Sequence, residues 1–212
     1  MFATDRDVLV VEPGLFARYA WLGQRVLVAS ASISGTVLTL GGGATFAAAG
    51  VGVGGVLLLG EVPVEVVAIT GAAVATVSLL RAGVGDAAIA PALSGAVMVT
   101  AYTFKPQIEI AHRQLMRMIG VDVDGSTPGG ATASMVRNPR EVAWVEAVLA
   151  ARLVLSAQAA SFGHEQQMDR SLKLLDARAR AGIESLRVLL DTDGDGVADV
   201  VRMPSVAWMG RV

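Results

Sequence analysis

The sequence lacks cysteine, carries little charge, and has few aromatic residues and only two histidines. Without cysteine there can be no disulfides, thiolate metal sites or cysteine nucleophiles. The net charge of −2 gives no field strong enough to imply nucleic acid or anionic lipid as the main partner. Hydrophobic residues make up 53% of the 212 residues and charged residues 17%, which is apolar for a lone soluble domain. The chain therefore lies in a membrane, packs against partner subunits, or forms a β-rich domain of small residues.

No charged residue occurs from Val26 to Gly60, a stretch long enough for a transmembrane span. Glycines interrupt this stretch repeatedly, and its flanks lack the asymmetry of basic residues that sets membrane topology. We therefore expect β structure with glycine turns and no membrane partner. A small membrane-associated protein with this segment in lipid is the alternative. The N-terminus does not resemble a signal peptide, so synthesis in the cytoplasm is expected.

Short apolar runs bounded by glycine, proline or serine fill the region from Val26 to Phe104. Their spacing predicts a small glycine-rich β-barrel or sandwich, although alanine, which is frequent here, is a poor strand former. The runs occupy residues 37–40, 56–59, 64–69, 75–80 and 96–102.

Helix signals lie on both sides of the β region. Thr4 and Asp7 have the spacing of a capping box, which predicts a short helix from Asp5 to Val11 that ends before Pro13. After residue 104 we expect three helices, beginning near residues 105, 138 and 164.

The last two of these helices have the clearest signals. Asn138 is a candidate cap that Glu141 could complete as a capping box. An apolar stripe at helical spacing runs from Met168 to Leu190, with charged residues off it, and predicts a helix from about His164 to Val188. We expect this helix to pack against the preceding one as a hairpin.

The predicted fold class is α+β. A short N-terminal helix and a C-terminal helical block form a helical core, into which the small glycine-rich barrel or sandwich is inserted, and a C-terminal strand or extended tail follows. The expected segments are an N-terminal helix (1–25), an inserted β-rich module (26–104), a helical domain (105–190), and an acidic turn with a C-terminal strand or tail (191–212).

One motif with specific chemistry stands near the C-terminus. Asp191, Asp193, Asp195 and Asp199 occupy positions one, three, five and nine of a segment with glycine at position six, like the start of a calcium loop. The bidentate glutamate of a full loop is missing, because position twelve is Arg202. Calcium binding and a plain acidic hairpin turn both remain open, and either role would be structural.

Other residues do not assemble into a catalytic set, so we expect no enzyme activity and no required cofactor. The glycines from Gly50 to Gly55 match a dinucleotide fingerprint on paper, but no strand–helix–strand unit surrounds them, and a loop between strands explains them better. His112 and His164 lack the neighbours of a metal or catalytic site and are expected at a surface or an interface.

Taken together, the chain resembles the head–tail connector (adaptor) proteins of tailed phages. The resemblance rests on the start Met1-Phe2-Ala3-Thr4-Asp5-Arg6-Asp7-Val8, the capped helices, and the extension near the acidic turn. It implies a homo-oligomeric ring, commonly of about twelve copies, in the neck of a virion assembled in the host cytoplasm. The expected partners are portal protein, tail or terminator proteins, and double-stranded DNA passing without sequence specificity.

The resemblance also suggests a role for the apolar C-terminal tail. Val206, Trp208 and Met209 would dock onto a partner, because tails that become ordered on binding are common in such assemblies. The alternatives to a connector are the membrane-associated protein described above and a calcium-stabilised structural module.

Overall fold

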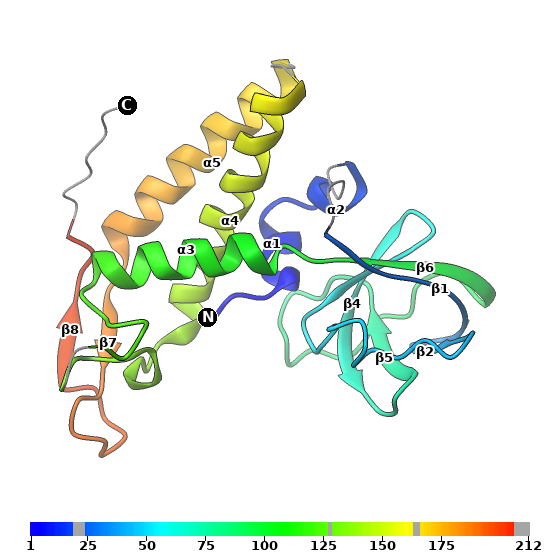
Figure 1. The fold of residues 1–212 in the computed structure, drawn as a ribbon, viewed down its shortest axis with the longest axis horizontal. Coiled ribbons are helices and arrows are strands. Elements are labelled where there is room, and N and C mark those ends of the chain that lie inside the picture. The colour runs from blue at the N-terminus through cyan, green and yellow to red at the C-terminus, as the bar shows by residue number, and fades with distance from the viewer. Residues whose placement is uncertain (19–23, 127–128, 163–165, 206–212) are drawn as a thin grey trace. The chain divides into compact units, whose positions relative to one another are not determined.

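The computed structural model describes residues 1–18, 24–126, 129–162 and 166–205 (Figure 1). Its internal contacts divide the chain into two compact units. Residues 4–105 form one, called here the barrel unit, and residues 1–3 together with 106–212 form the other, called the helical unit.

The barrel unit contains a closed antiparallel barrel. The sequence predicted either a small barrel or a sandwich, and the barrel is confirmed. Around the barrel the strands run in the order β1-β2-β5-β4-β3-β6, with β6 closing against β1. The six strands are β1 (Arg25–Ser34), β2 (Val37–Leu40), β3 (Val56–Leu59), β4 (Val62–Ile69), β5 (Val74–Ser78) and β6 (Gly95–Tyr102).

The order of the strands follows from the lengths of their connections. Strands β3, β4 and β5 are joined by tight turns and pair in sequence. The longer connections 41–55 and 79–94 carry the chain past this group, so β2 lies beside β5 and β6 beside β3, a Greek-key arrangement. Gly35 and Gly60, in two of the tight turns, have φ of 58° and 63°, a conformation that favours glycine.

Alternate residues of each strand point into the barrel and form its core. Ala31, Ala75 and Ala101 are among these inward residues and are almost fully buried. A barrel of few strands has a narrow interior, so small inward side chains let larger ones fit opposite them. This explains why a region rich in alanine still forms strands.

Two helices, α1 (Asp5–Val11) and α2 (Gly14–Arg18), pack against the outside of β3 within the barrel unit. All four residues of β3 are therefore buried. The rings of Phe16 and Phe104 meet edge to face at 4.8 Å. The sequence predicted α1 with the observed bounds but assigned it to the helical core, and it missed α2, because Pro13 and Gly14 were interpreted only as a helix end.

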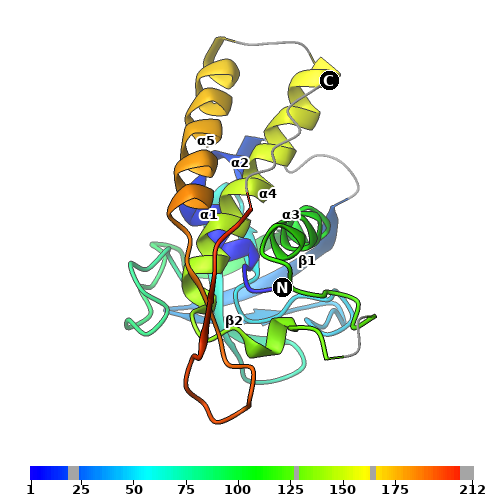
Figure 2. The ribbon, with the colours of Figure 1, turned by 90° about the vertical axis from the view of Figure 1, so that its left-hand side faces the viewer.

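The helical unit contains α3 (Lys105–Met118), the 3-10 turn η1 (Ala133–Met135), α4 (Pro139–Phe162) and α5 (Gln166–Ser185). Helices α4 and α5 lie side by side (Figures 1 and 2), as the apolar stripe predicts. Helix α5 ends earlier than expected, because residues 188–190 leave the helix and form strand β7 (Val188–Leu190), which pairs with β8 (Val200–Arg202).

The start of α4 differs from the expected capping box. The side-chain oxygen of Asn138 accepts the backbone amide of Leu189 at 2.9 Å. Its side-chain nitrogen donates to Glu141 and to the carbonyl of Arg187, both at 2.6 Å. Asn138 thus ties the start of α4 to the segment that leads into β7.

Among the described residues, one segment is long and apolar enough, by length and composition alone, to cross a membrane: Pro139–Ala159 in α4. Two thirds of its most apolar window (67%) is buried inside the structure, as for the core helix of a helical hairpin. The uncharged run 26–60 contains strands β1, β2 and β3 and glycine turns instead of a helix.

Candidate functional site

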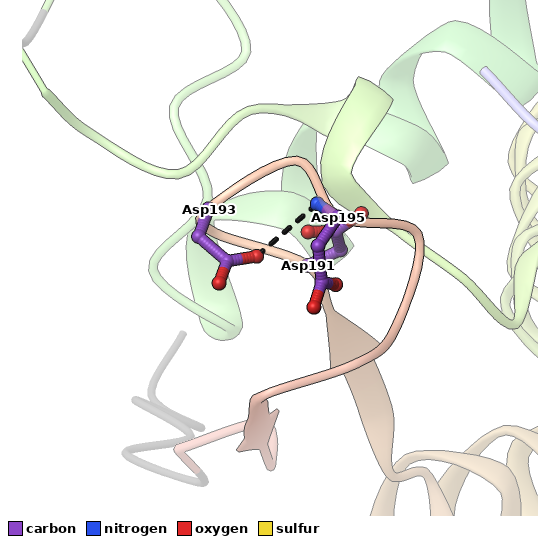
Figure 3. Close-up of side chains that lie close together, drawn as sticks. All are labelled: Asp191, Asp193 and Asp195. Atoms are coloured by element: carbon purple, nitrogen blue, oxygen red, sulfur yellow. Dashed lines mark hydrogen bonds between the residues drawn. The ribbon is translucent and has the colours of Figure 1, made fainter.

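The acidic segment predicted to bind calcium is the turn of a β-hairpin. Strands β7 and β8 pair antiparallel, and residues 191–199 connect them (Figure 3). Gly194 and Gly196 have φ of 82° and 93°, so the loop contains two backbone conformations that other residues rarely adopt. The expected hairpin turn is therefore confirmed as the local fold.

The turn brings three of the four predicted carboxylates together. One oxygen each from Asp191, Asp193 and Asp195 lies within 4.8 Å of the others. Asp191 is buried, whereas Asp193 and Asp195 are exposed. The fourth residue, Asp199, does not join this group. Its carboxylate accepts the backbone amide of Thr192 at 3.0 Å and the hydroxyl of Thr192 at 2.6 Å.

Asp191 organises the loop. Its two oxygens accept the amides of Gly194 and Gly196 at 2.7 and 2.9 Å, and the guanidinium of Arg137 donates to it as well. The hydrogen bond from Arg137, helped by these two amides, lowers the pKa of Asp191 to about 2. The hydroxyl and then the amide of Thr192 likewise lower the pKa of Asp199.

The donor set fits one side of a hard divalent cation. Calcium takes six to eight oxygens, and three clustered carboxylates supply part of that shell. Arg202, at the position of the missing glutamate, donates instead to the carbonyl of Ile119 at 3.3 Å. Arg137 already balances the charge of Asp191, so a cation would compete with this ion pair. Asp191, Asp193 and Asp195 would hold the ion, and its role would be to fix the hairpin.

The residues predicted to dock onto a partner, Val206, Trp208 and Met209, lie outside the described residues, as does His164. The last described residue, Ser205, is held to the end of α3, where its amide donates to the carbonyl of Met118 at 2.9 Å.

A buried ion triad that the sequence analysis missed lies in the barrel unit. Glu65 on β4 is fully buried, and its carboxylate accepts Nε of Arg6 at 2.6 Å and Nε of Arg81 at 2.7 Å. Burial alone would raise the pKa of Glu65, but the hydrogen bonds from Arg81 and the charge of Arg6 outweigh it and lower that pKa. The same pairing raises the pKa of Arg81.

A second buried pair joins His112 of α3 to Glu146 of α4. Nδ1 of His112 lies 2.7 Å from the Glu146 carboxylate, which is completely buried. The other oxygen of Glu146 accepts the amides of Phe2 and Ala3. His112 was expected at a surface or an interface, but it is buried because Glu146 provides a partner.

The sequence contained a signal for both clusters. Glu65 stands alone between valines in a strand, and Glu146 stands alone in the apolar run of α4. A single acid within an apolar element is rarely left without a partner, because a buried unpaired charge is very costly. The identity of the partners was not readable, since they come from distant parts of the chain.

The exterior of the barrel is almost free of charge. Residues 26–104 contain only four charged residues: Glu61, Glu65, Arg81 and Asp86. Glu65 and Arg81 are buried in the triad, so Glu61 and Asp86 are the only charged side chains of this range left for the surface. Soluble protein surfaces usually carry about 25–35% charged residues.

The outward positions of β1, β2 and β6 form a continuous surface, called here the uncharged face. Strand β1 pairs with β2 on one side and with β6 on the other. Val28 and Met98 are 50% and 55% exposed on this face, and Arg25 stands at its end. The face comprises Val26, Val28, Ser30, Ser32, Val37, Thr39, Ala96, Met98 and Thr100.

Comparison of the chain with protein-family models, with curated proteins and with solved structures finds no significant match.

Proposed function

We propose that this chain is a non-enzymatic structural subunit of a tailed-phage neck. It would form a ring that acts as head–tail connector, joins the portal to the tail, and surrounds the passing DNA. The observation that supports this proposal is the uncharged face of the barrel. A surface of this size without charge favours contact with protein, because apolar and neutral groups lose little hydration when another subunit covers them.

The composition of the uncharged face favours a protein partner over lipid. Val28 and Met98 supply apolar area, and the exposed Ser30 and Ser32 on the same face supply hydroxyls for hydrogen bonding. Protein interfaces combine an apolar centre with about one hydrogen bond per 100–200 Å². In a ring, each subunit buries surface against two neighbours, which would also account for the high apolar content of the chain.

The buried polar groups of the described residues favour a structural role. Glu65 holds two arginines, Glu146 holds a histidine and two amides, and Asp191 holds a loop. Each of these carboxylates bonds to several protein groups that tie separate segments of the fold together, which suits a structural role.

A calcium-stabilised structural module is the second candidate, and the cluster of Asp191, Asp193 and Asp195 favours it. The two proposals are compatible, because an ion in the hairpin would act on the helical unit and leave the barrel face unchanged. They differ in what they predict. A connector assembles through protein surfaces, whereas the stability of a calcium module should fall when a chelator removes the ion.

The test is the molar mass of the protein in detergent-free buffer, measured by light scattering alone and with candidate portal protein. Closed rings, formed alone or only with portal, are the expected result. A requirement for detergent would favour the membrane-associated alternative. A monomer that ignores portal would overturn the connector proposal.

A pair of variants locates the contact. Val28→Glu with Met98→Glu places two charges on the uncharged face, and we expect rings to be lost while the monomer stays folded. Val53→Glu is the matched control, because Val53 is 65% exposed in a loop away from this face. Rings that survive the double substitution would exclude the uncharged face as the contact.

A further inference from the structure

The helical unit contains every Asp-Gly pair of the sequence: 124–125, 193–194 and 195–196. At such a pair the amide nitrogen of the glycine can attack Cγ of the aspartate before it, because glycine has no side chain to hinder the approach. The new C–N bond closes a five-membered succinimide ring. One oxygen of the protonated carboxyl leaves as water, which carries off the carboxyl proton and the amide proton.

Water then opens the succinimide at one of its two carbonyls and restores the mass of the chain. Cleavage between Cγ and the nitrogen returns aspartate. Cleavage between the main-chain carbonyl carbon and the nitrogen gives isoaspartate, in which the chain runs through Cβ and Cγ and the α-carboxylate is free. The reaction needs only water, so the local structure decides which pair undergoes it. All three aspartates are exposed, and exposure therefore does not distinguish the pairs.

In the acidic hairpin, the two nitrogens that would attack are held by Asp191. The amides of Gly194 and Gly196 donate to the two oxygens of its carboxylate at 2.7 and 2.9 Å. Attack would first have to break a hydrogen bond to a buried, charged acceptor. The negative charge of this carboxylate also opposes loss of the amide proton. Both nitrogens of the hairpin are therefore poor nucleophiles.

The carboxylates that would be attacked in the hairpin are held as well. Oδ1 of Asp193 accepts the amide of Asp195 at 3.2 Å (Figure 3), and Oδ1 of Asp195 accepts the amide of Val197 at 2.7 Å. Each side chain is thus bonded to the second amide after it instead of being free to turn toward the first.

The pair Asp124-Gly125 has neither restraint. In the described part of the chain, the Gly125 amide and the Asp124 carboxylate have no hydrogen-bond partner. The main-chain amide of Asp124 donates to Oδ1 of Asp122 at 3.0 Å, which leaves the side chain free to rotate. Nitrogen and carboxylate can therefore approach each other without breaking a bond.

We propose that Asp124 is a site of spontaneous isoaspartate formation, and that Asp191 protects the two Asp-Gly pairs of the acidic hairpin from the same reaction. This gives Asp191 a chemical role besides its structural one. The inference does not depend on the proposed function, since it concerns the helical unit of a single subunit.

The test is prolonged incubation of the whole protein at neutral pH and body temperature, followed by peptide mapping. Chromatography separates the isomeric peptides, and electron-transfer fragmentation locates the isoaspartate. We expect isoaspartate at Asp124 to form about tenfold faster than at Asp193 or Asp195, or more. In urea the three rates should become similar, because each aspartate then precedes an unrestrained glycine. Equal rates at the three pairs of the folded protein would overturn the proposal.

A pair of variants tests the protection by Asp191. Asp191→Ala removes both acceptors, and isoaspartate at Asp193 and Asp195 should then form at a rate close to that at Asp124. Thr192→Val is the matched control, because it removes the hydroxyl bond to Asp199 but leaves both acceptors in place, and it should keep the rates low. Unchanged rates in Asp191→Ala would overturn the protective role. So would an equal rise in Thr192→Val, which would trace the effect to general loosening of the loop.

Discussion

Oδ1 of Asp5 accepts a hydrogen bond from the backbone amide of Phe104 at 2.7 Å. This bond joins the first turn of α1 to the segment just after β6, which ends at Tyr102. Burial raises the pKa of Asp5 to about 6, although this hydrogen bond and the nearby Lys105 act to lower it. The native protein therefore binds a proton at Asp5 more tightly than the unfolded chain does.

This shift makes stability fall as pH rises. Between about pH 4 and pH 6 the unfolded chain releases this proton first, so the contribution of Asp5 is lost through that window and stays lost above it. We expect Asp5→Asn, which keeps an acceptor for Phe104, to stabilise the protein at pH 8 by on the order of 2 kcal/mol and to have little effect at pH 4. Urea unfolding at both pH values measures the difference, with Glu61→Gln as the exposed control.

Removing one partner from the triad of Arg6, Glu65 and Arg81 should cause a large loss of stability. Glu65→Gln leaves two buried guanidinium groups without their shared charge, and we expect a cost of about 3–5 kcal/mol in the free energy of unfolding. The measurement is urea denaturation of the single variants. The Glu61→Gln protein, changed in the adjacent turn, should unfold like the parent. A loss below about 1 kcal/mol would show that water reaches the triad.

The strands and helices could be predicted where local pattern decides them. Residues 37–40 and 56–59 were predicted as strands with the observed bounds, because glycine turns and apolar runs mark both ends. The helix of Asp5–Val11 was predicted for the same reason, since Thr4 and Asp7 form the capping box. These signals act within a few residues and need no tertiary contact.

What the sequence could not show depends on distant contacts. Strand β1 was not identified, because its outward serines and inward alanines carry a weak apolar signal until β6 pairs with it. Helix α5 was extended too far, because Leu190 continues the helical spacing although it pairs with Val200 in the hairpin. At the acidic site, three of the four predicted aspartates cluster, but the contribution of Arg137, which lies 54 residues away from Asp191, was not predicted.

Gly182 of α5 lies against the indole of Trp144 on α4. A Cβ at this position would lie 2.7 Å from an atom of the Trp144 ring, closer than van der Waals contact allows. Because Trp144 is 43% exposed, we expect Gly182→Ala to push the indole outward instead of separating the helices. The alanine also gains about 1 kcal/mol of helix propensity, so the net change in stability should be small.

Tryptophan fluorescence reports this displacement. In a protein whose other two tryptophans are replaced by phenylalanine, the emission of Trp144 should shift to longer wavelength in the Gly182→Ala variant. Ala181→Ser, at the exposed neighbouring position, is the control. An unchanged spectrum together with a stability loss above about 2 kcal/mol would mean that the helices, not the indole, had moved.

The acidic hairpin predicts a response to calcium that depends on three carboxylates and not on the fourth. If the ion binds the folded loop alone, the unfolding temperature should rise with calcium concentration and return to its starting value with chelator. Asp193→Asn and Asp195→Asn should each abolish most of this rise, because each removes the charge of one of the three clustered carboxylates. Asp199→Asn should keep the response, since its carboxylate bonds to Thr192.

The ion pair of Asp191 with Arg137 allows a calcium site to be distinguished from a plain turn. Asp191→Asn weakens the bond to Arg137 and destabilises the hairpin in either case. Without calcium, that loss should be present at pH 7 and vanish as pH falls through the range between the unfolded pKa and about 2, where the native carboxylate also becomes protonated. Arg137→Gln separates the two cases. If the loop is a calcium site, Arg137→Gln should strengthen calcium binding, because it removes a competing cation. If the loop is a plain turn, the unfolding temperature should not change with calcium in any variant.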